Sequence, residues 1–264
     1  MNKNLNKRNN LLLALSGIFL TNAILAELIG VKIFSLESLL GIPPAGIRLA
    51  EGITLDFNLT AGVVIWPAVF VTTDVINEYF GKRGVRKVSF LAAGMIAFAF
   101  LVVAAAVHLP PADFWLEING KDPAGNDFNI DYAFSVVYRQ GLGIIIGSLV
   151  AFLVGQSLDA TIFHHFRRIT GNRKVWLRAT GSTLISQLFD SFVVLVIAFY
   201  IFGDWSFGQT ISVGIINYIY KFAVAVVLTP VIYFAHRVID LYLGKEMARE
   251  MIASASADTA FRRE

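Results

Sequence analysis

Two pairs of side chains in this sequence each combine an amide with a carboxylate three residues later. Gln156 precedes Asp159, and Gln187 precedes Asp190, within the similar stretches 155–160 and 186–191. On an α-helix this spacing places both side chains of a pair on one face. A carboxylate accepts two N–H hydrogen bonds, and an amide can donate to a carbonyl beside them. The pairs are therefore suited to hold the edge of a purine-like ring, with helix-to-helix hydrogen bonding as the alternative.

Further ionisable residues occur inside equally apolar stretches: Glu27, Lys32, Asp74, Glu78, Arg139 and Lys221. In a membrane span each central charge costs about 2.5–3.5 kcal/mol on insertion scales, so such groups face a wet cavity or one another. Asp74 and Glu78 are four residues apart and share a helix face. The simpler interpretation of Glu78 is an ion pair with a cation of the following loop, Arg83, Arg86 or Lys87.

Long apolar segments must position these residues. Of the 264 residues, 56% are hydrophobic and only 16% are charged, whereas soluble domains are near one quarter charged. Six segments are long enough to cross about 30 Å of hydrocarbon. We therefore predict an all-α, polytopic membrane bundle over 1–244, followed by a tail over 245–264. The predicted spans are 11–34, 59–80, 86–109, 133–163, 176–202 and 211–236.

The loop charges predict the orientation of the bundle. The amino-terminal arm, the loops after the second and fourth spans and the tail together carry seventeen Lys and Arg residues, and the alternate loops carry two. Positive loops stay in the cytoplasm, so both termini are expected there, in a bacterial-type inner membrane. This distribution indicates a lipid bilayer as the partner of the chain and not a nucleic acid.

Several smaller features refine this picture. Segment 37–58 predicts a turn with a short hairpin, segment 110–132 predicts an acidic, solvated loop, and the tail after about Gly244 predicts a short amphipathic helix. Pro67 and Pro230 are expected to kink the second and sixth spans. Small residues recur every four positions in the fourth span, which favours close packing within the chain or, alternatively, a homodimer seam. They are Gly143, Gly147, Ala151 and Gly155.

Two stretches resemble the queuosine precursor transporter family, which belongs with the vitamin uptake transporters. One is 61–67 followed by 72–83, with Thr-Thr-Asp-Val-Ile-Asn-Glu-Tyr-Phe-Gly-Lys-Arg. The other is 139–159 followed by 176–190, with Gly-Ser-Thr-Leu-Ile-Ser-Gln-Leu-Phe-Asp. The resemblance covers about 15–240. It implies six helices, an inner-membrane location and import of 7-deazaguanine bases, the cyano and aminomethyl precursors of queuosine. The implied substrate-binding residues are Asn22, Lys32, Asp74, Asn77, Glu78, Arg139, Gln156, Asp159, Gln187 and Asp190.

Three hypotheses for function follow. The first is a secondary transporter or facilitator that imports a deazapurine base alone. The second is a substrate-binding subunit of an energy-coupling-factor transporter, which would need ATPase partners. The third is an intramembrane aspartyl hydrolase using Asp159 and Asp190; the sequence has no Gly-x-Gly-Asp signature, so we expect no enzyme. Cysteine is absent and the four histidines have no metal-ligand spacing, so we expect no metal or other cofactor.

Overall fold

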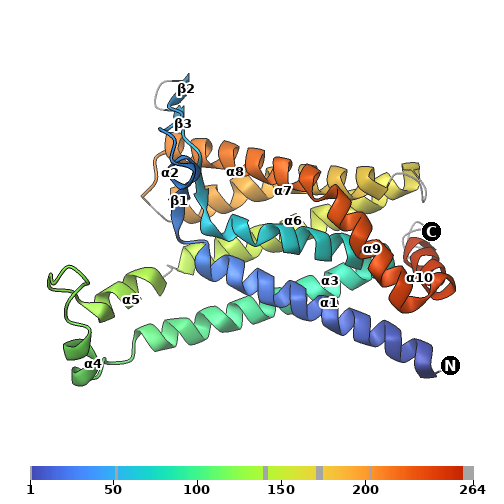
Figure 1. Cartoon of the computed structure of the whole chain (residues 1–264), viewed down its shortest axis with the longest axis horizontal. Helices are drawn as coiled ribbons and strands as arrows, with labels where there is room; N and C mark the ends of the chain where they lie inside the picture. The colour runs from blue at the N-terminus through green and yellow to red at the C-terminus, as the bar shows by residue number, and fades with distance from the viewer. Residues whose placement is uncertain (1, 51–52, 139–141, 171–174, 202–203, 258–264) are drawn as a thin grey trace.

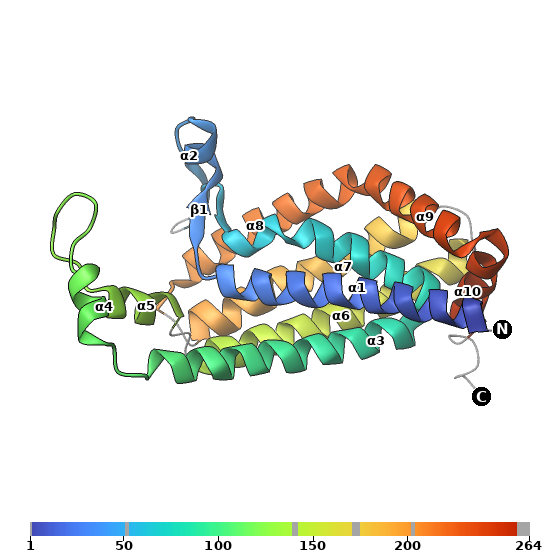
Figure 2. The ribbon, with the colours of Figure 1, turned by 60° about the horizontal axis from the view of Figure 1, so that its bottom comes forward.

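The computed structural model describes residues 2–50, 53–138, 142–170, 175–201 and 204–257, and these ranges are mostly helical. Four helices within them are long and apolar enough to cross a membrane: Asn4–Ile29, Trp66–Val107, Leu184–Ile201 and Phe207–Val227. The long helices lie roughly side by side (Figures 1 and 2). The start of the first helix and the last described helix, 245–257, lie at one end of the bundle, and the short strands lie at the other end.

Helix α1 (Asn2–Ile29) packs along α3 (Trp66–Val107), which folds back on itself. The reversal occurs at Gly81, whose φ of 67° and ψ of −172° interrupt the helix. An added Cβ at Gly81 would come within 3.1 Å of the Ala255 carbonyl oxygen, so both the backbone angle and the close neighbour require glycine. Helix α3 therefore has a first arm, 66–80, and a second arm, 82–107. These arms correspond to the second and third predicted spans.

The predicted fourth span is two helices, α5 (Ile130–Tyr138) and α6 (Leu142–Thr170). Helix α6 packs along α7 (Val175–Leu195), which continues as the π-helical turn η2 (Val196–Ile201), and also along α3. Three of the four small residues recurring along α6 (Gly147, Ala151 and Gly155) are buried by the chain's own helices. Their burial agrees with packing inside one chain.

The predicted sixth span is interrupted as the proline suggested. Helix α8 (Phe207–Val227) ends at Leu228, and α9 (Thr229–Leu243) begins with Pro230 in its first turn. Pro67 behaves differently: it occupies the first turn of α3, where a missing N–H costs no hydrogen bond. The expected kink at Pro67 is therefore wrong, because the proline starts its helix instead of interrupting it.

The segment between α1 and α3 forms two small antiparallel ladders. Strand β1 (Ile33–Ser35) pairs with β4 (Asn58–Thr60), and β2 (Ile47–Ala50) pairs with β3 (Ile53–Leu55). Between them lies α2 (Leu36–Leu40), and η1 (Ala61–Val64) leads into α3. The fold is thus not purely helical, and the hairpin expected near 37–58 is confirmed. Helix α4 (Asp113–Ile118) lies in segment 110–132, whose residues are largely exposed.

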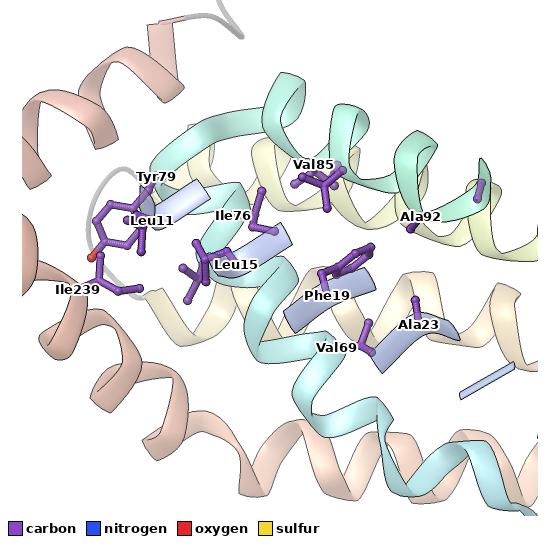
Figure 3. Close-up of a cluster of buried hydrophobic side chains, with 14 of the residues drawn as sticks. Leu11, Leu15, Phe19, Ala23, Val69, Ile76, Tyr79, Val85, Ala92 and Ile239 are labelled. Atoms are coloured by element: carbon purple, nitrogen blue, oxygen red, sulfur yellow. The ribbon is translucent and has the colours of Figure 1, made fainter. Parts of the chain in front are cut away.

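The main apolar core joins α1 to both arms of α3 (Figure 3). Leu11, Leu15, Phe19 and Ala23 recur every four residues along α1 and face side chains such as Val69 of the first arm. Phe19 also packs 6.0 Å from the Phe152 ring of α6. This core fixes α1 and α3 against α6, so the polar residues of α3 and α6 are held at a constant separation.

The expected amphipathic tail helix is confirmed as α10 (Lys245–Ala257). Its buried residues, Ala248, Met251 and Ala255, face the bundle, and the helix packs against α3 and α9. It covers the end of the bundle at which α3 reverses (Figure 1). The tail therefore belongs to the packed structure.

Candidate functional site

The carboxylate of Asp159 on α6 connects three helices. The Asn77 amide, on the first arm of α3, donates to Oδ2 over 3.3 Å, and the Ser186 hydroxyl, on α7, donates to Oδ1 over 3.4 Å. All three residues are at least 95% buried. Both hydrogen bonds are long for their types, so a better-placed donor could replace either at small cost. We name the side chains of α3, α6, α7 and α8 around Asp159 the polar seam.

Several oxygen atoms of the polar seam have no hydrogen-bond partner. They are Asn77 Oδ1, Gln187 Oε1, Ser191 Oγ and Asn217 Oδ1, each on a residue at most 6% exposed. A buried acceptor without a donor costs about 1–3 kcal/mol, so native proteins retain few without a reason. A surplus of acceptors is the arrangement that a donor-rich ligand would satisfy.

Helix α8 brings its polar residues close to those of α7. An added Cβ at Gly214 would lie 2.8 Å from the Phe192 ring, so the two helices touch there. Because α7 and α8 run antiparallel (Figure 1), Asn217 lies near the level of the turn between Gln187 and Ser191. The polar residues of α7 and α8 therefore lie at a similar level along the bundle.

Lys221, one turn beyond Asn217 on α8, is only 5% exposed. Its ammonium lies 4.9 Å from the centre of the Trp66 ring, and Trp66 packs 5.8 Å from Phe70. Such a cation–π contact stabilises a desolvated ammonium by about 2 kcal/mol. A cation and two aromatic rings thus adjoin the polar seam at the start of α3.

Glu78 has a different role from Asp159, although both are buried. Its carboxylate lies 3.6 Å from the Arg167 guanidinium of α6, which also donates to the Ile252 carbonyl of α10 over 2.9 Å. The neighbouring Tyr79 donates to Asp240 of α9 over 2.8 Å. We name these contacts the end layer. Glu78 thus forms an ion pair with Arg167, a partner that the sequence pattern did not indicate.

The remaining predicted site residues are dispersed. The Asn22 amide donates to the Ile18 carbonyl of its own helix over 2.7 Å, and Lys32 is exposed beyond the end of α1. Gln156 lines a cavity between α6 and the second arm of α3. Asp74 is 2% exposed and lies one turn before Asn77. Arg139 and the side chain of Asp190 lie outside the described residues.

One buried carboxylate outside the bundle was not predicted. Glu37 of α2 is 2% exposed; it accepts hydrogen bonds from the Phe57 and Ala45 amides, over 2.7 and 3.3 Å, and from the Ser35 hydroxyl, over 2.9 Å. Burial alone would raise the pKa of Glu37, but these hydrogen bonds outweigh it and lower the pKa below its usual range. The sequence signal that could have indicated the burial of Glu37 is its position between the apolar residues Leu36 and Leu39.

Long apolar helices surrounding a buried seam of amides, carboxylates and a cation define a polytopic membrane protein with a polar interior. Charged and amide groups are retained at such depth where they contact a polar solute. Within the described ranges, no three His, Asp or Glu side chains come together as metal ligands. The class that this combination defines is the small-molecule membrane transporter.

Comparison with known proteins identifies the family. Residues 60–235 match the family model described as "Putative vitamin uptake transporter". The chain is 32% identical over 198 residues to a "Probable queuosine precursor transporter" of Bacillus subtilis, covering 74% of this chain and 80% of that protein. It is 26% identical to the "Queuosine precursor transporter" of Escherichia coli, over 66% of this chain and 70% of that protein. A Haemophilus influenzae relative is 25% identical over 66% of each chain.

The chain therefore belongs to the queuosine precursor transporters of the vitamin uptake transporter family. No solved structure matches it. Helix α10, which covers the end layer, lies beyond the residues that the family model matches.

Proposed function

We propose that this protein imports queuosine precursors, the 7-cyano and 7-aminomethyl forms of 7-deazaguanine, across the bacterial inner membrane. The observation that carries the proposal is the surplus of buried acceptors in the polar seam. A deazaguanine presents a ring N–H and an exocyclic amino group beside a carbonyl, so it is rich in donors. The names of the relatives agree with this substrate class.

The Asp159 carboxylate accepts the ring N–H and amino group of the base in this proposal. The Asn77 amide, which reaches Asp159 over 3.3 Å, turns to donate to the base carbonyl. Gln187 accepts a further N–H, and its neighbour Asp190 belongs to the same helix face. Asp74 supplies a second carboxylate one turn away, suited to the aminomethyl ammonium. The Phe70 ring, one turn before Asp74 on α3, provides an apolar face for the planar base.

We do not include Asn22, Lys32, Glu78 and Gln156 in the contact set. Asn22 is bound to its own helix, and Lys32 is exposed beyond the end of α1. Glu78 is engaged in the end layer, and Gln156 lines a separate cavity.

In the membrane, we propose six crossings: α1, the two arms of α3, α6, α7 with η2, and α8 continued by α9. Support comes from the lengths of these segments and from the reversal at Gly81. Both termini then lie in the cytoplasm, since the start of α1 and helix α10 share one end of the bundle with the α3 reversal and its Lys82 and Arg83. Residues 1–244 form the transport domain and 245–264 the cytoplasmic tail, whose α10 closes the cytoplasmic end.

The transporter acts alone, as a secondary transporter or a facilitator. A homodimer is not part of the proposal, because Gly147, Ala151 and Gly155 are buried within the chain. Proton coupling would require a carboxylate that gains and loses a proton during the cycle. Uptake unchanged after collapse of the proton gradient would exclude it. ATPases that copurify with the protein from native membranes would instead indicate an energy-coupling-factor subunit.

The experiment that tests the substrate uses cells that neither make queuosine precursors nor carry another importer. The protein is expressed in them, each candidate base is supplied in turn, and queuosine in tRNA is measured. We expect modification at low external concentrations of at least one of the two bases, dependent on the protein. Equal modification with and without the protein would contradict the proposal.

A further inference from the structure

A cavity with polar side chains in its lining lies outside the polar seam, between the second arm of α3 and α6. Its volume is about 240 Å³. On the α3 side it is lined at positions 82, 85, 86, 89 and 90, and on the α6 side at 153, 156, 157, 160 and 161. Both sets recur at spacings of three and four, so one continuous face of each helix borders the cavity.

The floor of the cavity contains two buried polar side chains. Ser89 is 4% exposed and Gln156 is 6% exposed. Neither Ser89 Oγ nor Gln156 Oε1 has a hydrogen-bond partner. Each such atom costs about as much as a lost hydrogen bond, so a ligand with hydroxyl groups would stabilise both.

The rim of the cavity carries two cations, Lys82 and Arg86, both exposed. The Lys82 ammonium donates to the Thr161 hydroxyl over 2.9 Å, which uses one of its three N–H groups. The Arg86 guanidinium lies 5.8 Å from the centre of the Phe90 ring. A phosphate group at the rim could therefore accept hydrogen bonds from both Lys82 and Arg86 without displacing Thr161.

The outer surface beside the rim is apolar. Phe90 and Leu91 on α3 are 56% and 51% exposed, and Val150 and Val154 on α6 are 45% and 42% exposed. Within a membrane-spanning segment, such a surface faces acyl chains. Arg86 and Lys82 lie one and two helical turns before Phe90 on α3, towards its reversal at Gly81. Cations next to an acyl-facing surface match an anionic phospholipid.

We propose that this cavity binds the headgroup of an anionic phospholipid of the phosphatidylglycerol type. The phosphodiester contacts Lys82 and Arg86, and the headgroup hydroxyls fill the floor, one donating to Gln156 Oε1 and one bonding to Ser89. The acyl chains lie over Phe90 and Val154. The inference rests on the membrane placement of the bundle and not on the identity of the imported base.

The test is native mass spectrometry of the purified full chain titrated with phosphatidylglycerol or phosphatidylcholine. Two double variants, K82Q/R86Q and R83Q/K87Q, each remove one lysine and one arginine from the start of the second arm of α3, but only the first pair lines the cavity. We expect wild type to prefer phosphatidylglycerol, K82Q/R86Q to lose roughly tenfold or more in affinity for it, and R83Q/K87Q to lose less than roughly threefold. Equal losses in both variants, or no preference in wild type, would overturn the proposal.

Two further experiments address misfolding of the K82Q/R86Q variant and the source of the phosphate group. If K82Q/R86Q unfolds, Ser89→Leu fills the floor without changing charge and is expected to abolish the lipid preference; undiminished binding would overturn the assignment. Glycerol 3-phosphate is expected not to displace the lipid, because it lacks acyl chains. Displacement would show a soluble phosphate ligand and contradict the proposal. Base uptake by protein without lipid preference would leave the import proposal standing.

Discussion

Glu37 and Asp159 are both buried carboxylates, but their surroundings differ. Glu37 accepts two backbone N–H groups and a hydroxyl, the shortest contact at 2.7 Å, and these donors tie α2 to the strands around it. Asp159 accepts from an amide and a hydroxyl over 3.3 and 3.4 Å, and acceptors without donors lie around it.

We propose that this difference separates a structural carboxylate, Glu37, from a ligand-binding one, Asp159. Three hydrogen bonds, two of them from backbone N–H groups and the shortest 2.7 Å long, fix the charge of Glu37 and the local chain path together. Long hydrogen bonds from side chains can be exchanged for those of a solute. Burial alone therefore does not identify a site; the supply of donors around the charge does. The predictions below test this contrast, starting with the largest expected effect.

Asp159→Asn should abolish import while leaving the protein folded. The variant loses the charge that accepts two N–H groups of the base, and each charge-assisted hydrogen bond contributes about 1.5–3 kcal/mol. We expect uptake per folded protein to fall about a hundredfold or more, measured as queuosine in tRNA. Asp113→Asn, in the exposed first turn of α4, is the matched control and should import normally. Normal import by Asp159→Asn would remove this residue from the site.

Arg167→Gln should lower stability without changing the affinity for the base. The change leaves the Glu78 carboxylate buried beside a neutral side chain, and breaking a buried ion pair costs about 3–5 kcal/mol. The double variant Glu78→Gln/Arg167→Gln should recover part of the loss, because position 78 then no longer carries a buried charge. Melting temperatures in detergent measure both effects. An unchanged melting temperature for Arg167→Gln would show that the end layer does not hold the bundle.

Glu37→Gln should destabilise the segment between α1 and α3 and leave import per folded protein unchanged. The neutral amide accepts the backbone N–H groups more weakly, at a cost of about 1.5–3 kcal/mol. Faster limited proteolysis between β1 and β4 at neutral pH is the measurement. If import decreased by a larger factor than the amount of folded protein, Glu37 would also act in import. That result would contradict the difference proposed between the two carboxylates.

The same carboxylate predicts a pH dependence. The pKa of Glu37 is lower in the folded protein than in the unfolded chain, so its stabilisation is present above the unfolded pKa and is lost as pH falls through the folded pKa. Proteolysis by an acid-active protease should therefore accelerate in wild type as the pH drops below the ordinary glutamate range. Glu37→Gln should lack this component. Parallel pH profiles for the two proteins would assign the acid sensitivity to other groups.

Ser186→Ala should have the smallest effect. The hydroxyl reaches Asp159 over 3.4 Å, so its removal costs no more than about 1 kcal/mol. We expect a two- to fivefold change, roughly, in the base concentration that gives half-maximal uptake. A loss as large as that of Asp159→Asn would mean that Ser186 contacts the base directly.

The sequence predicted long apolar helices, and four helices of the described residues are long and apolar enough to cross a membrane, because length and composition govern membrane insertion. It also placed Asp159 and Gln187 on helices, since a spacing of three is a local property. Contacts between distant segments were harder to predict. Arg167 was expected among the cations of the loop after the fourth span, but it pairs with Glu78, which lies 89 positions earlier in the sequence. The expected kink at Pro67 was wrong because a proline disrupts the interior of a helix but is favourable in its first turn. Glu37 was missed because its donors come from backbone, which carries no sequence signature.

Equilibrium binding of radiolabelled 7-aminomethyl-7-deazaguanine and 7-cyano-7-deazaguanine to the purified protein tests the polar seam most directly. We predict saturable binding of at least one base to wild type and to Glu37→Gln, and its loss in Asp159→Asn at an unchanged melting temperature. Binding by Asp159→Asn as tight as that of wild type would contradict the placement of the substrate between α3, α6 and α7.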